Sequence, residues 1–434
     1  MLDSKKKFRE MDRSERLNYL RKEADLSERD IDTITDPNAA FSFDNANQMI
    51  ENTIGIFSLP LGIATKFVIN AKEYLIPMVI EEPSVIAAAS NAAKIASQRG
   101  GFTATNVDEA LMIGQVQLVS IPPHLSRSTI KKILHHKSEL LNLANSNSRS
   151  VIARDLQIKE IEDKSQNMMG KMLIIELLVD TKDAMGANVI NTMCEAISPK
   201  LEVLTGGKVI VRILSNYSTR RLVRCKAIFA RDELGGEAIV DRILYAYAFA
   251  YSDPYRAVTH NKGIMNGIDA VALATGQDFR AIEAAAHAYA ARDGTYRSMT
   301  RWYKTNDGDL AGELELPLAV GTVGGVVSVH PMTKLAIKIL GVKSAKELAA
   351  VLAAVGLAQN FAAMKALVSE GIQAGHMRLH ARNIAVLAGA RGDLIKLVAQ
   401  RIADEKNVNV HRAKEIIALM TEKNLNNNTY DNNK

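Results

Sequence analysis

Four short segments combine ionisable side chains with glycine or proline in otherwise apolar surroundings. The first is RAVTHNKGIMNGID, residues 256–269, where Lys262 stands among asparagines and glycines. A lysine can polarise a carbonyl group or stabilise an alkoxide as a fixed positive charge, which works best in a dry pocket. The alternative is a surface lysine with no chemical role. Because glycine lowers the cost of unusual backbone conformations, the spacing predicts a loop here.

The second segment is a pair of carboxylates at a junction between a strand and a helix. Glu81 and Glu82 follow the apolar run YLIPMVI and precede Pro83 and Ser84. Two neighbouring carboxylates can raise the pKa of one of them and give it a role in proton transfer. The alternative is that Glu82 and Ser84 only cap the helix predicted over residues 83–98, since the helix dipole favours acidic side chains in the first turn.

The other two segments contain an aspartate and three histidines. Asp278 precedes a predicted helix that carries His287, and the alternatives are an N-cap aspartate and a packed helix histidine. His376 and His380 are four residues apart, a spacing that could place two metal ligands on one helix face. No third ligand is evident nearby, so we expect no metal site. A lone histidine beside a glycine better fits a proton donor, with a structural histidine as the alternative.

For phosphate binding, the sequence contains neither a Gly-x-Gly-x-x-Gly nor a Walker A pattern. The best candidate is the segment from Asp183 to Asn188, which follows the apolar strand KMLIIELLVD and opens a helix. Gly186 would let a ligand approach the backbone, and a helix N-terminus attracts anions. Helix starts of this kind are common, so this pattern alone does not identify a cofactor.

Composition limits the class of protein. The 434 residues suggest two or three domains, with 47% apolar and 24% charged residues as in soluble globular proteins. A net charge of +6 is too mild and dispersed for nucleic-acid binding but suits an anionic small ligand. The two cysteines, Cys194 and Cys225, predict buried thiols. Without an apolar signal segment or an unbroken membrane span, we expect a cytoplasmic protein.

Apolar periodicity and turn residues predict the elements that position these side chains. The first 36 residues read as two short amphipathic helices. Three strand-like runs, LMIGQVQLVSI, KMLIIELLVD and KVIVRILSN, alternate with helical stretches and indicate a compact α/β insert. From residue 237 onward the chain is alanine-rich and helical, interrupted by one hairpin whose turn signal is Asp307-Gly308.

Taken together, these segments are more specific than any one of them. The chain contains, in this order, EEPSVIAAAS, DTKDAMGANVINTM, THNKGIMNGID, HAYAARDG, and VGLAQNF followed by EGIQAGHM. Their order and spacing resemble class II 3-hydroxy-3-methylglutaryl-coenzyme A reductases, over roughly residues 10 to 425. The resemblance implies a reduction by two hydrides, in which the thioester becomes a hemithioacetal, coenzyme A leaves, and the aldehyde becomes mevalonate. It implies two nicotinamide cofactors per product and no metal.

The resemblance also implies roles for individual residues. Lys262 would polarise the thioester carbonyl, and Glu82 would be the proton donor for the carbonyl. Asp278 would tune the pKa values of the lysine–carboxylate network, and His376 would protonate the departing thiolate. Substrate contacts would come from Ser84, Arg256, Asn266 and Gln359, and the cofactor would be lined by Asp183, Met185, Gly186, Asn188 and Asn216.

The fold class implied by the resemblance is α+β. A large, mostly helical substrate-binding domain would consist of residues 1–109 and 219–375, around a small inserted cofactor domain over 110–218. This insert would be a ferredoxin-like α/β unit and not a Rossmann domain. A helical C-terminal flap would cover residues 376–425 and close over the site to exclude water. The polar tail 426–434 is expected to be disordered.

One loop bears on the choice of cofactor. Relatives that prefer NADH carry an acidic residue after a helix ending in Leu-Ala-Asn, whereas this chain has Ser148 and Arg149 there. Loss of the carboxylate and gain of an arginine favour a 2′-phosphate, so we expect NADPH, with NADH as the alternative.

Several points stay open at this stage. The resemblance implies a homodimer or a higher homo-oligomer with active sites at the interface, and no nucleic-acid or membrane partner. Whether mevalonate is made or degraded, with NAD in the second case, is not determined. A different coenzyme A enzyme would need a metal or a nucleophilic cysteine, and a non-reductase coenzyme A-binding protein would have lost one of the four charged residues.

Overall fold

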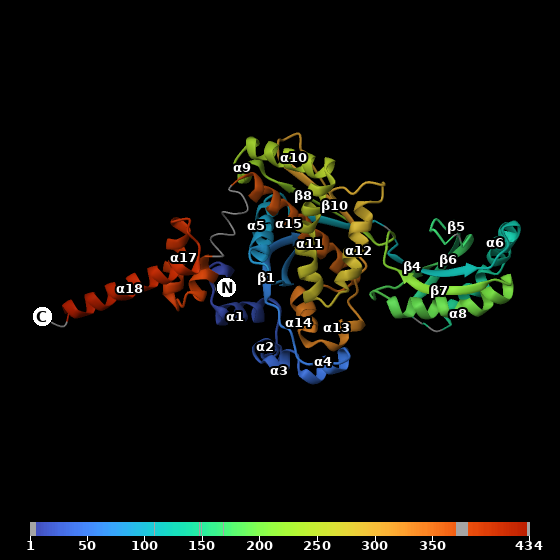
Figure 1. The fold of residues 1–434 in the computed structure, drawn as a ribbon, viewed down its shortest axis with the longest axis horizontal. Coiled ribbons are helices and arrows are strands. Elements are labelled where there is room, and N and C mark those ends of the chain that lie inside the picture. Colours follow the sequence, from blue (N-terminus) through green and yellow to red (C-terminus); the bar gives the residue numbers. More distant parts are fainter. Residues whose placement is uncertain are drawn as a thin grey trace.

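The structure is a computed structural model that describes residues 6–107, 109–146, 148, 150–167, 169–369 and 381–431. A central body of helices surrounds one sheet. A second, smaller sheet with its own helices projects from one side of this body, and the last helices lie on the other side (Figure 1).

A six-stranded sheet in the order β2-β1-β3-β8-β10-β9 forms the centre of the body. Every neighbouring pair is antiparallel except β1 and β3, which are parallel. Its strands precede and follow the smaller sheet in sequence, so the smaller sheet is an insertion into the central body. The strands are β1 (Leu61–Ile69), β2 (Lys72–Val79), β3 (Phe102–Asn106), β8 (Leu222–Phe229), β9 (Thr300–Lys304) and β10 (Leu310–Pro317).

Helix α15 (Ala345–Val368) is the centre of the helical layer, because every side chain from Leu348 to Phe361 is buried. Among the described helices, α15 alone is long and apolar enough to cross a membrane, yet 67% of its apolar window is buried inside the protein. It packs against α5, α11 and β8 and is therefore a core helix. The other helices of the body are α5 (Val85–Ser97), α9 (Arg231–Leu234), α10 (Glu237–Ser252), α11 (Pro254–Ala274), α12 (Phe279–Ala290), α13 (Gly325–Val329) and α14 (Pro331–Leu340).

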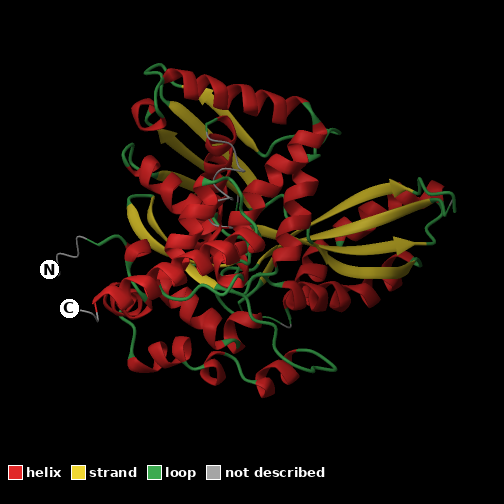
Figure 2. Cartoon of the chain, turned by 60° about the vertical axis from the view of Figure 1, so that its left-hand side comes forward, coloured by secondary structure: helices red, strands yellow, loops and turns green. Residues whose placement is uncertain are grey.

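The smaller sheet has the order β5-β6-β4-β7 and is antiparallel throughout. Along the chain its elements run β-α-β-β-α-β, with two consecutive helices at the first helical position, which is the ferredoxin-like arrangement. Figure 2 shows this sheet projecting from the body. Its elements are β4 (Leu111–Val119), α6 (Ser126–His135), α7 (Lys137–Asn145), β5 (Ile152–Glu162), β6 (Lys171–Asp180), α8 (Ala187–Thr205) and β7 (Lys208–Ser215), with the short 3-10 helix η2 (Pro123–Leu125) before α6.

Short helices make up both ends of the chain. Near the N-terminus are η1 (Phe8–Glu10), α1 (Arg13–Glu23), α2 (Glu28–Thr35), α3 (Pro37–Ala40) and α4 (Phe43–Met49). Buried Leu20 and Leu26 pack there against Leu335 and Ile339 of α14. Near the C-terminus, residues 381–387 are helical, followed by α17 (Asp393–Asp404) and α18 (Val410–Asp431), and these helices share a separate apolar cluster.

The structure differs from the sequence-based expectations at several places, among them strands β1, β3 and β8, which were not predicted. The loop predicted around Lys262 is instead the middle of α11, whose N-cap is Asp253 and whose first residue is Pro254. Strand β5 was not predicted, because its run IARDLQIKEIE is polar and only partly buried. Helix α18 continues to Asp431 although a disordered tail was expected from residue 426. Neither glycine nor proline interrupts the chain between residues 410 and 431.

Gly267, five residues after Lys262, allows close helix packing. A Cβ atom at Gly267 would lie 3.0 Å from Val355 Cγ1 and 3.1 Å from the Val355 carbonyl oxygen, and a Cβ at Gly356 of α15 would lie 2.8 Å from Ile268 Cδ1. Glycines on both helices therefore allow α11 and α15 to approach closely. A pattern that predicted backbone freedom instead reflects the contact between two helices.

Candidate active site

Glu82 and Lys262 are 180 residues apart in sequence and form an ion pair in the structure. Lys262 Nζ lies 2.9 Å from Glu82 Oε2, and Asn266, one turn further along α11, donates its amide to the same oxygen at 3.3 Å. Glu82 stands between the end of β2 and the start of α5. The Lys262 side chain is 60% exposed, so the ion pair remains accessible to a ligand. The fold thus brings together a cation, a carboxylate and an amide.

Ser84 lies two residues after Glu82, at the N-cap of α5. Its backbone is left-handed, with φ of 76°, and its side chain makes no capping hydrogen bond. This conformation costs about 1–2 kcal/mol in a residue other than glycine and persists where the surroundings impose it. The capping role weighed for Ser84 from the sequence is therefore not the one observed.

The two residues before Lys262 are buried and hold this part of α11 in place. Asn261 donates its amide to the Arg297 carbonyl oxygen at 2.8 Å and accepts from the Met299 backbone N–H at 3.0 Å. His260 Nε2 lies 2.8 Å from Thr300 Oγ1 and 3.1 Å from the Asn360 amide. Burial lowers the pKa of His260 to about 3, so this imidazole is neutral at physiological pH. These contacts orient the turn that carries Lys262.

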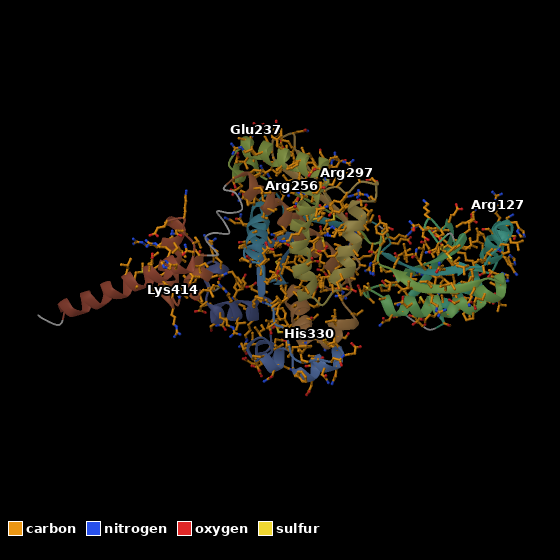
Figure 3. The ribbon with its side chains drawn as sticks, viewed as in Figure 1. Arg127, Glu237, Arg256, Arg297, His330 and Lys414 are labelled. Atoms are coloured by element: carbon orange, nitrogen blue, oxygen red, sulfur yellow. The ribbon has the colours of Figure 1, made fainter. Side chains whose placement is uncertain are left out.

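Two further predicted substrate residues have polar groups without a protein partner. Arg256 lies in the first turn of α11, on the central body, far from Arg127 at the distant end of the smaller sheet (Figure 3). Burial lowers the pKa of Arg256, and within the described ranges no carboxylate pairs with it. On α15, the side-chain oxygen Oε1 of the buried Gln359 has no hydrogen-bond partner among the residues that the structure describes. Both groups could bind a polar or anionic substrate.

Asp278 does not join the Glu82–Lys262 pair within one chain. It is the N-cap of α12, where it accepts from the Ala281 N–H at 3.1 Å, and it pairs with Arg280 at 3.0 Å. Lys262 is twelve residues before the end of α11, which is about 18 Å of helix rise. Within one chain, Asp278 is therefore an N-cap residue, which was the alternative considered from the sequence.

The segment that follows β6 forms a tight loop before α8. Asp183 accepts the Ala345 N–H on its carboxylate at 2.8 Å, and its carbonyl oxygen accepts the Thr322 N–H at 2.8 Å. Gly186 has a φ of 92° at the N-cap of α8, and a Cβ there would lie 2.4 Å from Thr181 Cγ2. The backbone is thus folded closely at the N-terminus of a long helix, as anion binding requires.

Sequence reasoning missed three residues that complete this loop, Gly321, Arg221 and Gln277. A Cβ at Gly321 would lie 2.7 Å from the Met185 backbone nitrogen, so the two segments touch through a glycine. The buried Arg221 donates to the carbonyl oxygens of Ala184 at 3.3 Å and Val320 at 3.0 Å. Gln277, the neighbour of Asp278, exchanges two hydrogen bonds with the Gly321 backbone at 2.9 and 2.8 Å. The glycine cluster in GTVGG, directly after β10, was the available signal.

The remaining predicted residues lie in different environments. Asn188 is in the first turn of α8, and Asn216 is exposed just after β7. Ser148 accepts the Val151 N–H at 3.1 Å in the turn between α7 and β5. Arg149, His376 and His380 lie outside the described residues. Within the described part of the chain, no cluster of three or more histidine, cysteine or acidic side chains could hold a metal ion.

Comparison with known proteins decides the family. The family model described as hydroxymethylglutaryl-coenzyme A reductase matches residues 12–381. The chain belongs to this reductase family. The 3-hydroxy-3-methylglutaryl-coenzyme A reductase of Archaeoglobus fulgidus is 50% identical over 412 residues, which cover 94% of this chain and 93% of that protein. The probable reductase of Borreliella burgdorferi is 36% identical over 360 residues, which cover 79% and 80%.

Solved reductase structures share the fold. The 3-hydroxy-3-methylglutaryl-coenzyme A reductase from Streptococcus pneumoniae is 42% identical with a TM-score of 0.79, over 95% of this chain and 99% of that one. A class II reductase structure from the same organism, bound to NADPH in open conformations, is 44% identical with a TM-score of 0.78, over 83% and 99%. The resemblance and the α+β class predicted from the sequence are confirmed.

The reductase is an NAD(P)H-dependent oxidoreductase. Its reaction is the reduction of 3-hydroxy-3-methylglutaryl-coenzyme A to mevalonate and coenzyme A, and its pathway is mevalonate metabolism.

Proposed function

We propose that Lys262 and Glu82 are the groups that act on the substrate carbonyl in this reductase. A hydride that adds to a carbonyl leaves negative charge on the oxygen, which requires a cation and then a proton. Lys262 supplies the fixed charge, and Glu82, in its protonated form, supplies the proton. The 2.9 Å contact between Lys262 Nζ and Glu82 Oε2 carries this proposal, since both groups can then reach one oxygen atom.

The substrate side chains are proposed from groups near this pair. Asn266 donates a hydrogen bond to Glu82 and so orients the carboxyl group. Ser84 contributes a hydroxyl group that makes no capping hydrogen bond to α5. Arg256 provides a positive charge for the carboxylate of the hydroxymethylglutaryl group, and Gln359 offers a buried unpartnered oxygen to a hydroxyl. Charge-assisted hydrogen bonds of this kind fix a substrate strongly.

Asp278 is proposed to reach the active site from a second copy of the chain. The span of α11 separates it from Lys262 in its own chain, whereas the lysine–carboxylate network requires contact. Large apolar side chains on α10 and α11 support an interface, with Tyr245 79% and Tyr255 88% exposed. Ile54 and Phe57, before β1, are also exposed large apolar side chains. A homodimer is therefore the smallest active unit.

The cofactor is proposed to be NADPH, as bound by the Streptococcus pneumoniae class II reductase, with NADH as the alternative. The loop at the start of α8 is proposed to bind a dinucleotide phosphate, because the backbone N–H groups at the N-terminus of a long helix attract anions. Bound NADPH supplies the hydride. The residues proposed to hold it are Asp183, Met185, Gly186, Asn188 and Asn216, with Ser148 and Arg149 at the 2′-phosphate.

The domains are proposed to divide this work. Residues 110–218 would bind the cofactor, and residues 1–109 together with 219–375 would bind the substrate. Residues 376–425 would form the flap, which carries His376 to the leaving thiolate. The apolar cluster shared by residues 381–387, α17 and α18 supports a flap that moves as one unit. We propose a cytoplasmic location.

One assay tests this function. The protein is mixed with 3-hydroxy-3-methylglutaryl-coenzyme A and either NADPH or NADH, and the absorbance of the reduced cofactor is followed. Oxidation is expected, faster with NADPH, and Arg149→Glu should reverse the preference. The reverse direction is measured with mevalonate, coenzyme A and the oxidised cofactors. Absence of turnover with either reduced cofactor would contradict the proposal.

A further inference from the structure

Helices α11 and α12 are joined by a chain of hydrogen-bonded ionisable groups outside the site described above. The Asp269 and Glu283 carboxyl groups face each other closely enough for each to act on the pKa of the other. Glu283 Oε2 lies 2.6 Å from His287 Nε2, and His287 Nδ1 lies 2.7 Å from the Tyr296 hydroxyl. The Tyr296 hydroxyl lies beside the Asn261 side chain, which acts on the pKa of this tyrosine. We call these five residues the α11–α12 ladder.

The contact between Asp269 and Glu283 requires a proton. An ionised carboxylate only accepts hydrogen bonds, so two carboxyl groups can bond each other only if one of them is protonated. Asp269 Oδ1 is buried without a partner, which costs less for a neutral acid than for a carboxylate. The ladder therefore holds one proton on Asp269, with Glu283 as the ionised member facing His287.

Electrostatics agrees with this assignment. Burial, followed by the hydrogen bond and charge of Glu283, raises the pKa of Asp269 well above its usual range. The hydrogen bond from His287 holds the pKa of Glu283 below its usual range. The ionisable groups that act on this carboxyl pair are thus its own two members and His287. Tyr296, in the segment after α12, has its pKa raised by burial and by Glu283.

The ladder connects the helices that carry two of the proposed catalytic residues. Asp269 is seven residues after Lys262 on α11 and so lies on the same helix face. Asn261, at the other end of the ladder, immediately precedes Lys262. Glu283 and His287 belong to α12, whose N-cap is Asp278. Arg297, the neighbour of Tyr296, lies at the same upper end of the body as Arg256 (Figure 3).

We propose that the protonated ladder is a positioning device that holds Asp278 on α12 and Lys262 on α11 in their working geometry. Loss of its proton to solvent base breaks the Asp269–Glu283 hydrogen bond and leaves two carboxylates in contact, which repel each other and separate the helices. This inference rests on the proposed roles of Lys262 and Asp278. It concerns Asp269, Glu283, His287 and Tyr296 as positioning residues, which do not touch the substrate.

Asp269→Asn tests the proposal, because asparagine donates a hydrogen bond to Glu283 but cannot ionise. The kcat and KM are measured from about pH 6 to about pH 10, each variant normalised to its own neutral kcat. The wild-type kcat should fall as Asp269 ionises. At alkaline pH, the fraction of its neutral kcat that Asp269→Asn keeps should be at least about three times the fraction that the wild type keeps. The KM for substrate should change little. Asp293→Asn, an exposed carboxyl group after α12, is the matched control and should follow the wild type.

Stability gives a second measurement. In the unfolded wild type, Asp269 loses its proton at its ordinary pKa, whereas the folded protein keeps the proton. The free energy of unfolding therefore decreases as pH rises from the ordinary pKa toward the raised pKa of the folded state. The gain in the free energy of unfolding of Asp269→Asn should therefore be small in acid and grow with pH. If the stability gain of Asp269→Asn grows with pH but the alkaline decrease of kcat is the same as in the wild type, the ladder only stabilises the fold. That result would overturn the proposal.

Tyr296→Phe is a second variant in case Asp269→Asn does not fold. Loss of the hydroxyl disconnects the ladder from Asn261, so kcat should fall by about three- to tenfold while KM stays the same. Unchanged kcat in this variant would count against the ladder. An inactive wild type would instead reject the proposed function, which keeps the two failures distinct.

Discussion

At the scale of single residues, the reductase depends on the charge of Lys262 being delivered to one oxygen atom. The neutral His260 and the buried Asn261 fix the backbone before it. The Lys262 side chain pairs with Glu82, whose carboxylate also accepts from Asn266. Lys262 is more than half exposed in this chain, so its contribution depends on substrate and a second chain excluding water around it.

Lys262→Ala should therefore abolish turnover. A transition-state interaction of this type contributes about 10²–10³-fold to kcat. Substrate turnover and circular dichroism should show an inactive but folded protein. Lys94→Ala, at an exposed lysine on α5, is the control and should keep normal activity. A Lys262→Ala enzyme within tenfold of the wild type would refute the assigned role.

The two cysteines offer a second prediction at this scale. Burial raises the pKa of the Cys194 thiol to about 12, and it also raises that of the fully buried Cys225. Since the thiolate is the reactive form, neither residue should react with a thiol reagent in the native enzyme. Two equivalents should react after denaturation. Rapid modification of the native protein with loss of activity would reopen the possibility of a nucleophilic cysteine.

At the scale of elements, α11 packs against β2 and α5, which places Lys262 beside Glu82, and it also packs against α15. Gly267 and Gly356 let the helix backbones approach, and Gly263, although close in sequence, faces more open space, with Ala363 Cβ at 4.0 Å from a built Cβ. The glycines of one motif therefore differ in their structural role.

Gly267→Ala should destabilise the enzyme and Gly263→Ala should not. The new Cβ at position 267 would meet Val355 and Gln359 at 3.0 Å, and overpacking of this kind costs about 1–3 kcal/mol. At position 263 alanine adds only helix propensity, worth up to about 1 kcal/mol in favour of folding. Urea unfolding of both variants measures the difference. Equal stability of the two would mean that α11 can shift away from α15 without cost.

At the scale of the whole molecule, a single chain is proposed to hold an incomplete active site. Glu82 and Lys262 meet within one chain, whereas Asp278 lies beyond the far end of α11 beside the loop that precedes α8. The large exposed side chains on α10 and α11 are costly in water and are covered if a second copy binds there.

Subunit mixing tests this arrangement. Lys262→Ala and Asp278→Ala should each be inactive as homodimers. After unfolding and refolding together, mixed dimers contain one site with both residues intact, so about a quarter of wild-type activity should return. Sedimentation or light scattering would follow the dimer. No recovery, with mixed dimers present, would show that Asp278 acts in its own chain.

Local sequence was sufficient for much of this protein. Alternating or periodic apolar residues predicted strands β4, β6 and β7 of the insert and the helix-rich character of the body. The hairpin at Asp307-Gly308 forms β9 and β10 as expected, whereas β1, β3 and β8 of the central sheet were not predicted. The order and spacing of several separate motifs predicted the family, because their combination is much more specific than any one motif. The Glu82–Lys262 pairing followed only from that resemblance, since no local pattern relates residues 180 positions apart.

The tertiary structure decided what those residues contact. Glycine near Lys262 predicted a loop because the sequence carries no information on which helix packs against it, and α15 supplied the reason for a helix. No sequence pattern indicated the Asp269–Glu283 pair, because Asp269 is expected to be protonated only when the fold places Glu283 against it. The second half of the rigid helix α11 separates Asp278 from Lys262. Local sequence does not show this separation, and a second subunit can bring the two residues together.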